Sequence, residues 1–317
     1  MDQIETIVTG RSKATYKGRQ ASAVDDLLAG YRPEGQDDVY RLSGTWQPGI
    51  RPFIDALDEI QANDLRSRWT QAQRTIADNG IAYNIRLQGS GDLRPWTLDP
   101  LPLVLSQTEW QKLEEGIQQR TNLMEALAED TFGSRQAMKD GILPKELVLA
   151  NPRFLRACAT LPLPGSRALW FSAMDLVRQQ GGTWQVMQDM VQSPSGAGFA
   201  LENRLLCADV LSEAYKACHA PRLAVFFKHL LKALYGLAPR YRDNPRIVLM
   251  TAGSYSPTYF EQSFLARYLG ITLVEGNDLT VRPNGVYLKA LDGLYQVDVI
   301  LRRVNDWYCD PLELADD

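Results

Sequence analysis

One carboxylate in the sequence occupies a position that could serve a metal ion. Two alternating segments within residues 167–190 flank Gly181 and Gly182, a pattern that predicts a β-hairpin. A turn at Gln180-Gly181 would pair Asp175 with Val186 and place on one face Phe171, Ala173, Asp175, Trp184, Val186, Gln188 and Met190. On this mostly apolar face the carboxylate needs a partner. A divalent cation or a nearby arginine would serve, and the residue types favour the arginine because hard cations usually take more carboxylates.

A loop of small residues follows the hairpin and precedes a predicted helix. Its sequence is SPSGAG, and its candidate phosphate contacts are Ser193, Ser195, Gly196 and Gly198. Backbone N–H groups at the start of a helix favour an anion such as phosphate. The competing interpretation is an ordinary turn with a helix cap, and the nearby hairpin face raises the odds of phosphate.

A second polar loop, GSYSPT, follows a buried apolar strand. It holds Gly253, Ser254 and Tyr255, and the helix behind it begins with Tyr259 and Glu261. Ligands of open α/β sheets bind at the carboxyl edge of the strands. These five residues are therefore candidate substrate contacts, with a tight strand-to-helix turn as the equal alternative.

Two arginines end the last predicted strand. Arg302 and Arg303 are followed by Asp306 and Asp310. One arginine could clamp a carboxylate or phosphate with two parallel hydrogen bonds. The alternative is a solvated network of charges.

The elements that must position these residues are predicted from periodicity. Helices are expected at about 63–79, 107–132, 199–218 and 221–237. Residues 246–275 read as a strand, a helix and a strand, which implies parallel strands. Turns at Asn284-Gly285 and Asp292-Gly293 precede a last strand at 295–304.

These elements predict a mixed α/β fold in four segments. Residues 1–50 are expected to form an extended arm, and 51–160 a mainly helical region. Residues 161–240 would carry the hairpin, the small-residue loop and two helices, and 241–317 an α/β domain.

Composition excludes several classes of protein. The 317 residues carry 34 basic and 38 acidic side chains, so nonspecific nucleic-acid or anionic-membrane binding is not expected. No apolar run approaches the ~20 residues of a spanning helix, and the N-terminus lacks a secretory signal. The four cysteines lie far apart, which indicates neither a zinc site nor a disulfide framework. We expect a reduced, cytoplasmic protein.

The order of several motifs resembles the circularly permuted type 2 ATP-grasp proteins, which are related to glutathionylspermidine synthase. The motifs are RPWTLDPLPL, ILPKELVLANPRFLR, DLVR, PSGAGFALENR, NPRIVLMTAGSY, YFEQSFLARYLG, LVEGNDLTVR and VDVILRR with DPLEL. The resemblance covers nearly the whole chain from about residue 30.

This resemblance implies an ATP-dependent carboxylate–amine ligase that uses Mg²⁺ and an acyl-phosphate intermediate. It implies Asp175 as a metal ligand and adds Asn203 and Arg204 to the phosphate-binding loop. The family's Glu and Asn positions hold Gln188 and Met190, so the metal site is degenerate. The alternative is that Asp189 or another acid substitutes for these ligands through a bulge.

Two functions follow from these observations. One is the N-terminal part of a ligase acting on a small or peptide substrate, completed by a C-terminal half or a partner subunit. The other is a non-catalytic binding module that keeps the fold, motivated by Gln188 and Met190. A dinucleotide-dependent oxidoreductase is a distant third, because no glycine fingerprint supports it.

Overall fold

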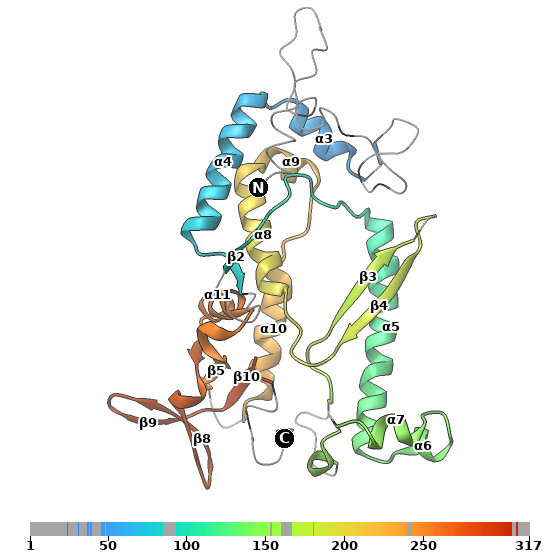
Figure 1. Ribbon diagram of the computed structural model, residues 1–317, viewed down its shortest axis with the longest axis vertical. Helices are drawn as coiled ribbons and strands as arrows, with labels where there is room; N and C mark the ends of the chain where they lie inside the picture. Colours follow the sequence, from blue (N-terminus) through green and yellow to red (C-terminus); the bar gives the residue numbers. More distant parts are fainter. Residues whose placement is uncertain are drawn as a thin grey trace, which may run out of the picture. The chain divides into compact units, whose positions relative to one another are not determined.

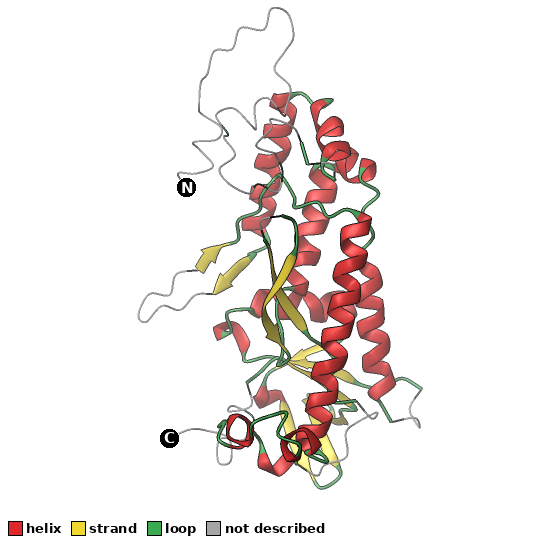
Figure 2. Ribbon diagram, turned by 90° about the vertical axis from the view of Figure 1, so that its right-hand side faces the viewer, coloured by secondary structure: helices red, strands yellow, loops and turns green. Residues whose placement is uncertain are grey.

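The computed structural model describes residues 24, 31, 37, 39, 46–47, 49–84, 93–152, 154–159, 167–179, 181–239, 243–305 and 309. The chain divides into two compact units. The first comprises residues 1–107 and 196–224, and the second 108–195 and 225–317. Helices and strands both occur (Figure 2), which confirms the mixed α/β class. The four-segment division stays a prediction.

The first unit is mainly helical. It contains α3 (Arg51–Asp58), α4 (Ala62–Asp78), α8 (Ala197–Val210), α9 (Ser212–Ala217) and a short antiparallel pair, β1 (Ala82–Asn84) and β2 (Leu93–Pro95). On α4 a stripe of Leu65, Ala72 and Ile76 is buried, as its helical spacing predicts. Gly80 follows the helix with a φ of 63°, a conformation that glycine adopts without strain.

The core of this unit combines residues far apart in the sequence. Leu211 and Ala214 are fully buried and pack with Phe53 and Leu57 of α3. The predicted single helix 199–218 is divided at Leu211, whose φ of −119° and ψ of 44° leave the helical region. Ile50 also lies in this core, although residues 1–50 were expected to form an extended arm.

The second unit begins with a long helix that supports a hairpin. The helix α5 (Gln107–Phe132) is followed by α6 (Gln136–Lys139), α7 (Lys145–Leu149) and a 3₁₀ turn at Arg156–Cys158. The strands β3 (Ala173–Arg178) and β4 (Trp184–Met190) form the predicted antiparallel hairpin and lie alongside α5 (Figure 1). Gly181 and Gly182 form its turn with φ values of 97° and 85°.

A parallel sheet forms the other part of the second unit. The strands β5 (Ile247–Met250), β6 (Thr272–Val274) and β10 (Val299–Arg302) are ordered β10-β5-β6, all parallel. The helix α11 (Tyr259–Leu269) connects β5 to β6, which confirms the predicted βαβ unit. Val248 and Leu249 on the central strand are fully buried. The helix α10 (Ala224–Leu237) packs through Leu234 on Ile247 and Val299.

An antiparallel meander lies between β6 and β10 in the sequence. It consists of β7 (Leu279–Arg282), β8 (Gly285–Ala290) and β9 (Gly293–Gln296). Its turns are Pro283-Asn284 and Leu291-Asp292, each one residue before the predicted position. The single last strand predicted from the sequence is two strands, β9 and β10, in different sheets. In the described ranges, no helix is both long enough and apolar enough to cross a membrane.

Candidate functional site

A bulge in the hairpin decides which side chains share a face. Asp175 lies opposite Gln188, and Ala173 opposite Met190, while Leu176 lies opposite Val186. The register shifts between Asp175 and Leu176. The predicted pairing of Asp175 with Val186 is therefore wrong, because one extra residue of β4 is accommodated at this point.

The face of the hairpin that lies on α5 is held by charged contacts. Glu109 of α5 accepts hydrogen bonds from the Arg178 guanidinium at 2.6 Å and from the Trp184 indole at 2.9 Å. Arg120 donates to both carboxylate oxygens of Asp189 at 2.6 Å. Hydrogen bonding to Arg120 lowers the pKa of Asp189 below its usual value. Trp184 and Asp189 thus lie on the inner face, where the predicted arrangement had put Trp184 beside Asp175.

The opposite face of the hairpin carries the two predicted metal ligands. Asp175 and Gln188 are both exposed and directly opposite each other. No ion pair of Asp175 occurs among the described residues, so the expected arginine partner is not found there. The apolar, buried face predicted for Asp175 is wrong, since the bulge turns Trp184 and Val186 to the other side.

The described residues do not form a complete metal cage. In the part of the chain that the structure describes, no three His, Cys, Asp or Glu side chains are grouped to hold a cation. Asp175 and Gln188 can offer one carboxylate and one amide carbonyl. Mg²⁺ in nucleotide sites often takes one or two carboxylates together with phosphate oxygens and water. These residues therefore fit a cation that arrives with a nucleotide, and not a free cation.

The small-residue loop crosses from the second unit to the first between Ser195 and Gly196. Ser193 and Ser195 are exposed, Pro194 is buried, and Gly196 has a φ of 115° before α8 begins. Gly198 is buried within the first turn of α8. The side chains of the two remaining candidates have protein partners. Asn203 accepts a hydrogen bond from the Trp96 indole at 2.8 Å, and Arg204 donates to the Pro221 carbonyl at 3.0 Å.

The polar loop after β5 lies at the carboxyl edge of the parallel sheet. Gly253 has a φ of 81°, and a Cβ there would lie 2.6 Å from a Glu275 carboxylate oxygen. Thr251 donates to the buried Gln262 side chain, whose amide donates to Ser256 at 3.2 Å and Thr258 at 2.9 Å. This network fixes the loop at the edge where a ligand would bind.

The remaining candidates at this edge differ in exposure. Ser254 is exposed and Tyr259 is half-buried, so both can meet a ligand, whereas the side chain of Tyr255 lies outside the described part. Arg302 ends β10 and donates to Cys309 at 3.5 Å.

Glu261 and Arg303 are brought together at the same edge but are buried. Their side chains are 1% and 4% exposed, with 3.7 Å between the Arg303 Nη2 and the Glu261 Oε2 atoms. Burial lowers the pKa of the Arg303 guanidinium, while the Glu261 carboxylate raises it. The sequence predicted two ligand contacts, and the structure shows an internal ion pair.

Several residues that position the site were missed from the sequence. Neither Glu109 nor Arg120 was named as a site residue. Thr251 and Gln262 read as ordinary strand and helix residues. The available signal was the position of Gln262, a polar residue at helical spacing from the apolar Leu265, Ala266 and Leu269 of α11.

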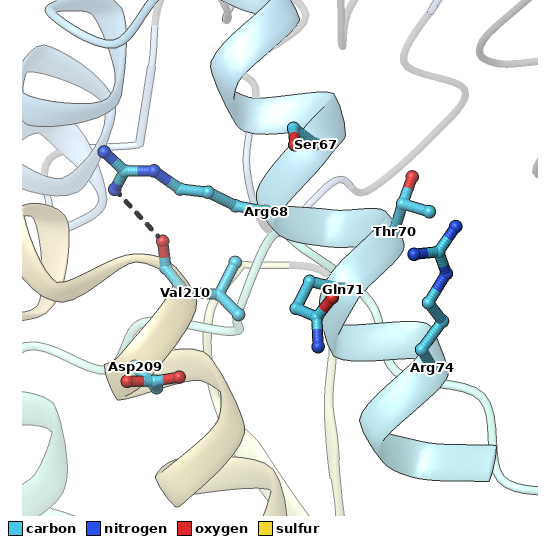
Figure 3. A pocket seen from close by; sticks show the side chains of 7 residues that line it. All are labelled: Ser67, Arg68, Thr70, Gln71, Arg74, Asp209 and Val210. Carbon is cyan, nitrogen blue, oxygen red and sulfur yellow. Dashed lines mark hydrogen bonds between the residues drawn. The ribbon is translucent and has the colours of Figure 1, made fainter. Parts of the chain in front are cut away.

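A separate groove in the first unit lies between α4 and α8 (Figure 3). It has a volume of about 580 Å³ and is lined by Ser67, Arg68, Thr70, Gln71, Arg74, Asp209 and Val210. Arg68 is occupied by ion pairs with Asp64 at 2.8 Å and Glu213 at 3.1 Å and by the Val210 carbonyl. Its polar lining is mostly exposed, unlike the enclosed apolar walls of typical small-molecule sites.

Comparison with known proteins places the chain in a family. An uncharacterised protein of Mycobacterium tuberculosis is 36% identical over 323 residues, covering 93% of this chain and 36% of that protein. A second one from the same organism is 34% identical over 281 residues, covering 89% and 50%. A Synechocystis protein is 30% identical over 275 residues, covering 87% and 57%. This chain thus spans about a third to somewhat over half the length of these relatives.

The family model of the circularly permuted ATP-grasp type 2 proteins matches residues 102–317. This range contains α5, the hairpin, the small-residue loop and the whole parallel sheet. The chain therefore belongs to the circularly permuted ATP-grasp type 2 family.

Proposed function

We propose that this chain forms part of an ATP- and Mg²⁺-dependent carboxylate–amine ligase. The observation that carries the proposal is the family match over residues 102–317. The substrate class we assign is a peptide or amino-acid-like carboxylate. The glutathionylspermidine-synthase-like character stays part of this proposal, as does completion of the nucleotide site by a C-terminal half or a partner subunit.

Two regions of the second unit support this function. The hairpin presents Asp175 and Gln188 on its exposed face while its other face is fixed to α5. The carboxyl edge of the parallel sheet presents the loop from Gly253 to Ser256, which is held by a hydrogen bond from the Gly253 N–H to Thr251 and one from the Gln262 amide to Ser256. A rigid support for both regions would lower the cost of ordering a bound nucleotide and substrate.

Each set of residues has a defined task under this proposal. Asp175 would contribute a negative oxygen and Gln188 a neutral oxygen to the magnesium ion that accompanies the nucleotide. That ion would neutralise phosphate charge when bound. The N–H groups near Gly196 would face phosphate, and Ser254, Tyr259 and Arg302 would contact the carboxylate substrate.

Calorimetry with ATP and Mg²⁺ on the intact chain tests the proposal. We expect saturable binding that Asp175→Ala weakens about tenfold or more, because a charged ligand is worth more than about 1.4 kcal/mol. Gln188→Glu should tighten binding, since it adds a second charge beside Asp175. Asp292→Ala, an exposed aspartate in the β8–β9 turn, is the matched control and should leave binding unchanged. Absence of saturable heat up to millimolar nucleotide would exclude nucleotide binding by this chain.

A non-catalytic binding module is the second candidate. The neutral Gln188 opposite Asp175 and the thioether of Met190 opposite Ala173 favour it, because both are weaker magnesium ligands than carboxylates. ADP release distinguishes the two. Turnover by the native chain would eliminate the binding module, whereas nucleotide binding without turnover, with turnover gained in Gln188→Glu plus Met190→Asn, would favour it.

A further inference from the structure

The segment before α8 is attached to the end of strand β10 by two contacts. Ser193 Oγ donates to the Arg302 carbonyl at 3.1 Å, and Arg303 Nη1 donates to the Pro194 carbonyl. Pro194 is buried between two exposed serines. The Ser193 hydroxyl and the carbonyl of the buried Pro194 thus fix the segment Ser193–Ser195 to the sheet.

Arg303 is itself held from several sides. Its backbone N–H donates to the Met250 carbonyl at the end of β5, at 2.8 Å. Its guanidinium pairs with Glu261 in the first turn of α11, where both side chains are almost fully buried. Removing a buried charge from its partner is costly, so the guanidinium has a fixed position from which to hold Pro194.

Ser193 shows that the segment is held against its own preference. Its φ of 44° lies in the left-handed region, which non-glycine residues seldom adopt. Such a conformation persists when surrounding contacts impose it. The contacts of this segment to Arg302 and Arg303 help to impose it.

We propose that Arg303 is a positioning residue that keeps the segment Ser193–Ser195 at the carboxyl edge of the parallel sheet. This inference rests on the proposed function, in which the segment contacts phosphate. Arg303 then links the phosphate-binding loop to the edge of the parallel sheet that holds the carboxylate substrate. Arg303 cannot also clamp the substrate, because its side chain is 4% exposed and is already bonded to Glu261 and Pro194. Arg302 is therefore the arginine that would clamp the carboxylate substrate.

Local proteolysis of the intact chain tests the proposal without requiring activity. Arg303→Lys keeps the positive charge beside Glu261 but loses the planar guanidinium that reaches Pro194 as well. We expect subtilisin to cleave within residues 191–196 about tenfold faster in this variant, since a hydrogen bond to a charged group is lost and cleavage follows local opening. Cleavage in the β7–β8 turn serves as the internal reference and should not change.

The matched control is Arg167→Lys, which alters the exposed ion pair with Glu125 in the same unit. It should leave cleavage at 191–196 unchanged. Equal cleavage of Arg303→Lys and the native chain at 191–196 would overturn the proposal, as would a rise of the same size at the reference turn.

Nucleotide binding separates this proposal from the proposed function. We expect Arg303→Lys to raise the Kd for ATP with Mg²⁺, because a segment that is no longer held in place must be ordered when the nucleotide binds. If the native chain binds no nucleotide, the proposed function fails while the cleavage comparison still decides the role of Arg303. If the native chain binds nucleotide and Arg303→Lys binds it equally, the link between loop and edge is refuted.

Discussion

Two aspartates of the same hairpin have opposite surroundings. Asp189 accepts two hydrogen bonds from the Arg120 guanidinium. Asp175, in contrast, is exposed and lacks an ion pair among the described residues. The bulge at Asp175 and Leu176 causes this difference, because it changes the face on which the residues of β4 lie. A carboxylate already paired with arginine is a poor candidate for metal binding, so Asp189 does not substitute for the acid that Gln188 replaces.

Substituting Asp189 tests the contribution of its ion pair through pH. Arg120 lowers the pKa of Asp189 in the folded chain, while the unfolded value is about 3.9. The pair therefore stabilises the fold above that value, and its contribution is lost as the pH falls through the folded pKa. We expect Asp189→Asn to lower the urea midpoint at pH 6 and this difference to shrink below about pH 4. Asp175→Asn is the control, and a difference that stays constant down to pH 2 would contradict the assignment.

Gly253 combines a backbone requirement with a close contact. Gly253→Ala should cost about 1–2 kcal/mol from its left-handed φ, plus the cost of displacing the Glu275 carboxylate. Gly141→Ala is matched, because Gly141 has a φ of 74° with nothing within 4 Å of an added Cβ. Chemical denaturation of the two variants measures the difference. Equal losses would show that Glu275 moves freely and that the contact has no structural weight.

At the scale of elements, periodicity predicted what local sequence determines. The hairpin, its glycine turn and the βαβ unit were predicted correctly, and both turns of the meander were predicted to within one residue. The predicted register of the hairpin was wrong, because a β-bulge cannot be recognised from the alternation of polar and apolar residues in one sequence. The last strand was predicted as one because residues 297 and 298 continue the polarity pattern, although Asp298 accepts a hydrogen bond from the Arg246 N–H at 2.7 Å where the chain changes sheets.

The site was predicted less completely than the elements. The carboxyl edge followed from the βαβ pattern, so Gly253 and Glu261 were found. Their roles depend on contacts over a large sequence distance, such as Glu261 with Arg303 and Pro194 with Arg303. The burial of Glu261, Arg303 and Pro194 depends on tertiary packing, which cannot be predicted from residue types alone.

Attachment of the hairpin to α5 can be measured by removing Glu109. We expect Glu109→Ala to destabilise the second unit by about 2 kcal/mol, because the Arg178 side chain, 14% exposed, and the Trp184 indole lose their acceptor. Glu125→Ala is the control in the same helix. Its partner Arg167 is 55% exposed, so a loss under about 1 kcal/mol is expected. Urea unfolding gives both values, and a loss for Glu109→Ala no greater than that of the control would refute this attachment.

At the scale of the whole molecule, two cores stabilise two units. Leu211 is fully buried in the first unit, together with Phe53 and Leu57, and Val248 is fully buried in the second. Within the described ranges, neither of these two clusters includes residues of the other unit. Each core therefore provides its own source of stability.

Leu211→Ala tests whether the cores are independent. The substitution should cost about 2–5 kcal/mol in the first unit, because it leaves a cavity in a packed core. Hydrogen exchange should accelerate in α3 and α8 and stay unchanged in β5. Val248→Ala is the reciprocal variant and should produce the opposite distribution. Acceleration of equal size in both units would show that they unfold as one cooperative body.

The order in which the chain is synthesised gives the division into units a consequence for folding. The first unit is interrupted by residues 108–195, and its core needs Leu211 and Ala214 from beyond that interruption. Domains on the ribosome fold as their residues emerge. Here α3 lacks its α9 partner until α9 has emerged from the ribosome, and by then α5 and the hairpin have already emerged. Translation speed over residues 108–224 thus sets how long the apolar faces of α3 and α4 stay without their partner.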